Sequence, residues 1–100
     1  MDRGKLISAH EFCARHSIEF SFIDSLRDEG LVEITKVEES EYISEDQLND
    51  LERIVRLHYD LDINIEGIET IMNLLQRIGT LQDEITFLRN RLRLYESSDF

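Results

Sequence analysis

The sequence predicts a mainly α-helical fold, in which a compact N-terminal domain is followed by one long helix. Apolar residues recur at alternating spacings of three and four over the last third of the 100-residue chain, a pattern typical of a helix with a narrow apolar seam. Two short amphipathic segments lie near the N-terminus, and the second one ends at a glycine. A segment rich in β-branched residues follows them. These observations predict a helix-turn-helix with a small β-wing before the long helix.

The first helix is expected over about residues 9–15. Ser8 and Glu11 have the spacing of a capping box, in which the serine hydroxyl accepts from a backbone amide of the first turn. The apolar pattern of this helix turns Phe12 and Cys13 towards the core.

Ser17 is the expected N-cap of the second helix, over about residues 18–29, and Gly30 is its expected left-handed stop. The inward positions of this helix are Phe22, Ile23 and Leu26. A strand over residues 31–37, a polar turn at 38–40 and a return strand at 41–43 complete the wing.

The third helix begins at a second capping box, from Ser44 to Gln47, and extends to about Asp60. Its inner face is formed by Leu48, Leu51, Ile54, Val55 and either Leu57 or His58. Asn64 is the expected cap of the final helix, over about residues 65–95. The expected domain boundaries are a winged helix-turn-helix domain at 1–66 and a coiled-coil helix at 67–100.

The heptad seam of the final helix requires a second helix, and the simplest partner is a second copy of the chain. The expected homodimer interface consists of Ile78, Leu81, Ile85, Leu88, Leu92 and Tyr95. Isoleucine at position a with leucine at d favours a parallel pair, in which Glu84 would meet Arg89 and Arg91 would meet Glu96. We favour an antiparallel pair, because Met72 and Leu75 tie the start of the helix to its own domain.

Charge is the most informative feature of the composition. The chain has 22 acidic and 11 basic residues and a formal net charge of -11. Residues 19–50 hold 11 of the acidic residues and only two basic ones, Arg27 and Lys36. Such a surface repels phosphate and attracts basic protein surfaces. The alternative is a solvated surface that only keeps the protein soluble.

The sequence offers little for catalysis, cofactors or membranes. No apolar run reaches 18 residues, and the N-terminus lacks a signal-peptide pattern, so a cytoplasmic protein is expected. A zinc site of His10, Cys13 and His16 lacks an evident fourth ligand, and a buried structural thiol is the preferred interpretation of Cys13. No nucleophile with an oxyanion-binding feature is present, so neither an enzyme nor a bound cofactor is expected.

Several short segments resemble the winged helix-turn-helix of the MerR class. They are Leu6-Ile7-Ser8, Gly30-Leu31-Val32 and Tyr42-Ile43-Ser44-Glu45-Asp46. Within that class the chain resembles the CbpM chaperone-modulator family. The matching segments are Glu11-Phe12-Cys13, Arg53-Ile54-Val55-Arg56-Leu57, Leu61-Asp62-Ile63, Gly67-Ile68 and Leu88-Arg89-Asn90-Arg91-Leu92.

The resemblance to CbpM implies an inhibitor that binds the J-domain of a DnaJ-like co-chaperone. It would block both the stimulation of Hsp70 by that co-chaperone and the binding of the co-chaperone to DNA. The resemblance to the wider class implies an alternative, a MerR-type DNA-binding transcriptional regulator. A third possibility is an acidic dimeric adaptor for another protein.

Charge separates the first two functions. The MerR pattern has a phosphate-binding arginine in its second helix and another before an aromatic residue in its wing, where this chain has Asp24 and Glu41. Leu26 stands at the family's tyrosine position. Because reversed charges repel phosphate, we expect no direct DNA binding.

The same charges suit the Lys/Arg-rich helix that J-domains dock on Hsp70. The expected partner-binding surface consists of Asp24, Asp28, Glu29, Glu33, Glu38, Glu39 and Glu41, with Tyr42 as the candidate anchor.

Overall fold

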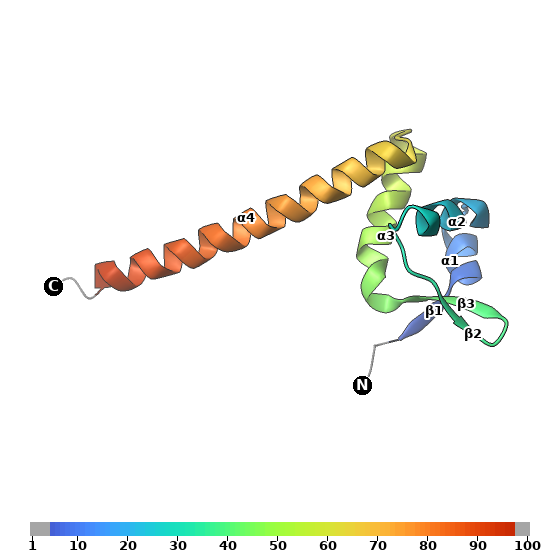
Figure 1. The fold of residues 1–100 in the computed structure, drawn as a ribbon, viewed down its shortest axis with the longest axis horizontal. Coiled ribbons are helices and arrows are strands. Elements are labelled where there is room, and N and C mark those ends of the chain that lie inside the picture. The colour runs from blue at the N-terminus through green and yellow to red at the C-terminus, as the bar shows by residue number, and fades with distance from the viewer. Residues whose placement is uncertain (1–4, 98–100) are drawn as a thin grey trace. The chain divides into compact units, whose positions relative to one another are not determined.

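The computed structural model describes residues 5–97, and the chain divides into two compact units, Met1–Ile68 and Glu69–Phe100. The elements follow in the order β1 (Leu6–Ser8), α1 (Ala9–His16), α2 (Phe20–Asp28), β2 (Thr35–Val37), β3 (Ser40–Ser44), the 3-10 turn η1 (Glu45–Gln47), α3 (Leu48–Val55), the π-helical turn η2 (Arg56–Asp60) and α4 (Ile65–Ser97) (Figure 1). This order confirms the predicted fold class, with a helix-turn-helix, a small wing and a long C-terminal helix.

Helix α1 begins as predicted and extends one residue beyond its predicted end, to His16. The Ser8 hydroxyl accepts a hydrogen bond from the Glu11 amide at 3.2 Å. The prediction that Ser17 caps the second helix is wrong, because Ser17 takes a left-handed conformation, with φ 57°, at the end of α1. The amide of Ile18 then donates to the Cys13 carbonyl at 3.0 Å, which closes the helix in a Schellman motif. Helix α2 therefore starts later than expected and has no side-chain cap.

The end of α2 follows the prediction. Gly30 has φ 78°, in the region where a side chain would add strain. Its amide donates to the backbone carbonyl of Arg27 at 3.0 Å, and the Leu31 amide donates to the backbone carbonyl of Leu26 at 2.8 Å. These two bonds form a second Schellman motif, which satisfies the last carbonyls of the helix and turns the chain towards the wing.

The wing belongs to a three-stranded antiparallel sheet in the order β1-β3-β2. Strand β1 was not predicted, because three residues are too short to show alternation; it pairs Ile7 with Ile43. The strand expected from residue 31 begins only at Thr35. The backbone of Glu33 instead bonds to the Gln47 side chain, at 2.8 Å to its oxygen and 3.0 Å from its nitrogen. These bonds replace the ladder that a strand would need there.

The prediction of a second capping box at Ser44 is wrong, because the Ser44 side chain does not cap a helix. The Ser44 hydroxyl donates to Asp46 at 2.7 Å and accepts from Gln47 at 3.0 Å, so it makes no cap bond to the backbone. A 3-10 turn therefore precedes α3, and η2 then continues the helical path to Asp60, the predicted end. Asn64 caps α4 as predicted, since its side-chain oxygen accepts from the Gly67 amide at 2.8 Å.

The core lies between the helices and one face of the sheet. The predicted inward residues of the first two helices are buried, as are Leu51 and Ile54 of α3. The largest fully buried side chains are Ile23, Leu26, Ile43, Leu51, Ile54 and Ile68. Burying each such side chain contributes roughly 1.5–3 kcal/mol to folding. Leu48, Val55, Leu57 and His58 are only half-buried and form the margin of this core.

Candidate protein-interaction surface

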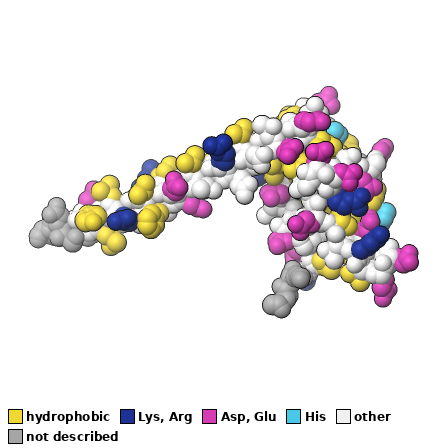
Figure 2. Space-filling model, in the orientation of Figure 1, with side chains coloured by type: hydrophobic (Ala, Val, Ile, Leu, Met, Phe, Trp, Pro, Cys, Tyr) yellow, Lys and Arg dark blue, Asp and Glu magenta, His cyan; other side chains and the backbone are white. Residues whose placement is uncertain are grey.

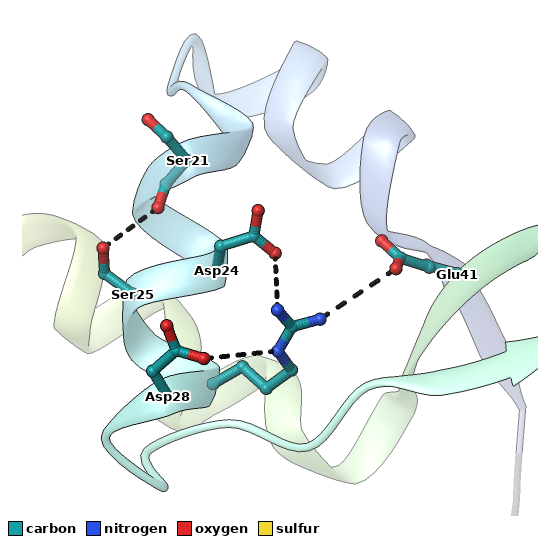
Figure 3. Close-up of polar contacts among 6 residues, drawn as sticks. Ser21, Asp24, Ser25, Asp28 and Glu41 are labelled. Atoms are coloured by element: carbon teal, nitrogen blue, oxygen red, sulfur yellow. Dashed lines mark hydrogen bonds and ion pairs between the residues drawn. The ribbon is translucent and has the colours of Figure 1, made fainter.

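Arg27, near the end of α2, is surrounded by three carboxylates (Figure 3). Its guanidinium nitrogens lie 3.2 Å from Asp24, 3.8 Å from Asp28 and 4.0 Å from Glu41. Two of these acids belong to α2 itself, and the third reaches the guanidinium from β3. Each exposed pair stabilises the fold by no more than about 1 kcal/mol. The larger consequence concerns the charge of the surface: one positive charge on Arg27 is outweighed by three negative charges around it.

Glu41 is the least exposed of these three acids. Its side chain is 20% exposed, whereas those of Asp24 and Asp28 are 44% and 72% exposed. Strand pairing places it directly opposite Lys36 of β2, and directly opposite side chains of unlike charge attract one another. Both basic residues of the acidic segment, Arg27 and Lys36, therefore have acidic neighbours.

The other predicted partner-binding residues lie at separate places in the same unit. Glu29 is the C-cap of α2 and is exposed. Glu38 and Glu39 form the two-residue turn between β2 and β3, and both are exposed. Glu33 is exposed in the α2–β2 connection. The structure thus brings Asp24, Asp28 and Glu41 together around Arg27, but it does not join all seven acids in one cluster.

Tyr42 lies in the central strand, paired with Ser8 on one side and Thr35 on the other. Its side chain is half-buried, so part of it remains available. The turn that precedes α4 carries a more exposed aromatic and a more exposed leucine, Tyr59 and Leu61, which the sequence analysis did not select. Neither residue belongs to the inner face predicted for the third helix, and Leu61 lies beyond its predicted end, but the sequence carries no signal that these two side chains share one turn.

A shallow polar hollow of about 330 Å³ lies between the α2–β2 connection and the start of α3. Three acids, Glu33, Asp46 and Asp50, contribute to its lining. Asp46 and Asp50 were not among the predicted site residues, although both fall within the acidic segment 19–50. Figure 2 shows acidic side chains at many points on the visible face of this unit.

Cys13 is a buried free thiol, as preferred from the sequence. Burial raises the pKa of the Cys13 thiol, and the negative charge of Asp24 raises it further. The histidines of the weighed zinc motif contact aromatic rings: His10 stacks on Phe20 at 4.3 Å, and His16 lies 4.2 Å from Phe12. Among residues 5–97, no group of three or more potential ligands is placed to hold a metal ion.

The predicted dimer residues lie along one face of α4. Exposed fractions are 48% for Ile78, 56% for Leu81, 49% for Ile85, 59% for Leu88, 57% for Leu92 and 67% for Tyr95. Figure 2 shows hydrophobic side chains along this helix. So much exposed apolar area on one helix exceeds what isolated surface residues present. The homodimer remains a prediction.

Within the described residues, no helix is long and apolar enough to cross a membrane. A family model described as "MerR HTH family regulatory protein" matches residues 7–90, from β1 well into α4. Neither the curated proteins nor the solved structures include a match to the chain.

Proposed function

We propose that this chain, which belongs to the MerR HTH family of regulatory proteins, is a regulator that binds a protein rather than DNA. The binding surface in this proposal is spread over α2, the α2–β2 connection and the β2–β3 hairpin, and it has the cluster around Arg27 at its centre. Its acids are Asp24, Asp28, Glu29, Glu33, Glu38, Glu39 and Glu41. No catalytic step and no cofactor are part of the proposal.

The observation that carries this proposal is the environment of Arg27. Helix-turn-helix proteins present their second helix to the major groove, and they gain affinity when cations replace the counterions of phosphate. Arg27 lies on that helix, but three carboxylates lie within 4.0 Å of its guanidinium. A phosphate that approached Arg27 would have to displace or approach these acids, so the surface disfavours DNA.

The proposed partner is the J-domain of a DnaJ-like co-chaperone, as the resemblance to CbpM implies. J-domains dock on Hsp70 through a helix rich in lysine and arginine, and an acidic surface complements such a helix. Covering that helix would inhibit the stimulation of Hsp70, and the same complex would reduce DNA binding by the co-chaperone. We place this regulator in the cytoplasm, as a homodimer held by the apolar face of α4.

The alternative is a MerR-type DNA-binding transcriptional regulator. The family match supports a regulator with a helix-turn-helix domain and does not decide between the two functions. The two functions predict opposite behaviour in one experiment. The protein is titrated with a purified J-domain and, separately, with duplex DNA, each at two salt concentrations. Our proposal expects binding to the J-domain that weakens at the higher salt, and no binding to DNA. Binding to DNA without binding to the J-domain would reverse this conclusion, and binding to neither would favour an acidic adaptor for another protein.

A further inference from the structure

The last two residues of the π-helical segment η2, Tyr59 and Asp60, and the two that follow it, Leu61 and Asp62, form a turn that we call the η2 turn. Leu61 is 63% exposed and Tyr59 is 46% exposed. They are the two most exposed large hydrophobic residues among the described residues of the Met1–Ile68 unit. Tyrosine is enriched among the interface residues that dominate binding, and a neighbouring exposed apolar residue enlarges the area that a partner can cover.

The backbone of the η2 turn is held by several hydrogen bonds. The Leu61 amide donates to the backbone carbonyl of Arg56 at 3.3 Å, and the Asp62 amide donates to the backbone carbonyl of His58 at 3.1 Å. Asp62 has φ 61°, a left-handed conformation that costs free energy and persists where surrounding contacts impose it. The π-helical hydrogen bonding of η2 is itself uncommon and is found frequently at functional sites.

His58 fixes the turn from its inner side. Its Nδ1 lies 2.9 Å from the Ile63 carbonyl, and because a carbonyl oxygen only accepts, Nδ1 carries the proton. The His58 ring stacks on buried Phe22 of α2, with ring centroids 4.4 Å apart. The Tyr59 ring meets Phe22 edge-on, at 5.4 Å. The Tyr59 ring and the backbone of Leu61 are thus held in place before a partner arrives, so a partner would lose little conformational entropy in ordering them.

Charge indicates which partner would cover the turn. Asp60 and Asp62 lie on either side of Leu61, both are exposed, and neither forms an ion pair with another side chain in residues 5–97. The nearest basic residues earlier in the chain, Arg53 and Arg56, are exposed and precede the η2 turn. Within the η2 turn itself, both charged residues are acidic. An apolar residue between two carboxylates complements an apolar residue that has lysine or arginine neighbours.

We propose that the η2 turn is the apolar anchor for a basic amphipathic helix of the partner protein. Leu61 packs against the apolar face of that helix, Tyr59 lies beside it, and the two aspartates pair with its basic side chains. This inference rests on the proposed function, and it replaces Tyr42 with Leu61 as the expected anchor. Helix α2 links the two regions, because Phe22 supports Tyr59 and Asp24 belongs to the acidic surface.

The test compares Leu61→Asn and the double variant D60N/D62N with a control, Leu6→Thr. Asparagine suits all three exposed turn positions, including the left-handed one at Asp62. Leu6 is also an exposed hydrophobic residue, at 41%, but it lies in β1. Affinity for a purified J-domain is measured by calorimetry. Leu61→Asn is expected to weaken binding about ten-fold or more, as for an interface hot spot, and Leu6→Thr less than about two-fold. D60N/D62N is expected to weaken binding and to reduce its salt dependence.

Thermal unfolding and sedimentation of each variant identify the cause of any change. A wild-type protein that does not bind the J-domain would overturn both the function and this anchor. Wild-type binding that Leu61→Asn leaves unchanged would overturn the anchor alone. A Leu61→Asn variant with an altered oligomeric state would show that a second copy, rather than the J-domain, covers the turn.

Discussion

The guanidinium of Arg27 lies 3.2 Å from the carboxylate of Asp24, which is three residues earlier on α2. A positive charge that faces outward on the second helix of a helix-turn-helix is thereby neutralised within its own helix. With Asp28 and Glu41 nearby, the local charge becomes negative. The arrangement makes Arg27 a useful probe of which kind of ligand this surface accepts.

Arg27→Ala separates the two functions. A DNA-binding regulator would lose a phosphate contact and bind DNA more weakly. In our proposal the acids bind the partner, so Arg27→Ala keeps or increases affinity for the J-domain. The free energy of unfolding, measured with urea, is expected to fall by less than about 1 kcal/mol, because exposed ion pairs are weak. A marked loss of J-domain affinity in a folded variant would contradict the assignment of the acids.

Charge reversal at the hairpin tests the acidic surface directly. The triple variant E38K/E39K/E41K places repulsive charges against a basic helix, and J-domain binding is expected to weaken, chiefly through a slower association rate. Surface plasmon resonance at two salt concentrations measures this rate, and sedimentation verifies that the oligomeric state is unchanged. Unaltered association would mean that the partner contacts another face.

The hairpin turn contains strain that a single substitution relieves. Glu38 has φ 58° at the first position of a two-residue turn, where glycine is favoured. Glu38→Gly is expected to raise the free energy of unfolding by about 1 kcal/mol. Glu39 has no positive φ, so Glu39→Gly is the matched control and is expected to give no gain. Equal effects of the two substitutions in urea denaturation would refute this account of the turn.

Two glycines of α4 give opposite predictions for the same substitution. A Cβ at Gly67 would lie 2.8 Å from the Ile63 side chain and 3.1 Å from the capping oxygen of Asn64. Gly67→Ala is therefore expected to destabilise the protein, by about 1–2 kcal/mol through loss of the cap. A Cβ at Gly79 meets nothing within 4 Å, so Gly79→Ala is expected to stabilise α4 by up to about 1 kcal/mol. Thermal melts of both variants test the contrast.

The apolar face of α4 is tested by a buried charge. Ile85→Asp places a carboxylate at an a position, where pairing of two helices would remove it from water, and the dimer is expected to dissociate. Asn90→Asp adds the same charge at an f position, on the opposite side of the helix, and is expected to leave the dimer intact. Sedimentation velocity distinguishes the two. A dimer that survives Ile85→Asp would show that the seam packs elsewhere.

Local signals explain what the sequence predicted well. The stop at Gly30, the Asn64 cap and the burial of Phe12 depend on residues within a few positions of one another. Ser17 misled because serine serves both helix starts and left-handed helix ends, and only the bond from Ile18 to Cys13 decides between them.

Long-range contacts account for the remainder. Strand β1 exists only through pairing with β3, and Glu41 reaches Arg27 from a different element. Spacing within α2 alone brings Asp24 and Arg27 together, whereas no local rule adds Glu41. The exposure of Leu61 likewise follows from the bonds that shape the η2 turn.

The pairing of Leu6 with Ser44 also sets an order of events during synthesis. The sheet cannot close until Ser44 has left the ribosome, by which time both α1 and α2 have already emerged. These two helices end in closed hydrogen-bonded caps that use only their own neighbouring residues. Strand β1, although it is synthesised first, can therefore pair only after β3 has emerged, so the contact that closes the sheet is among the last to form.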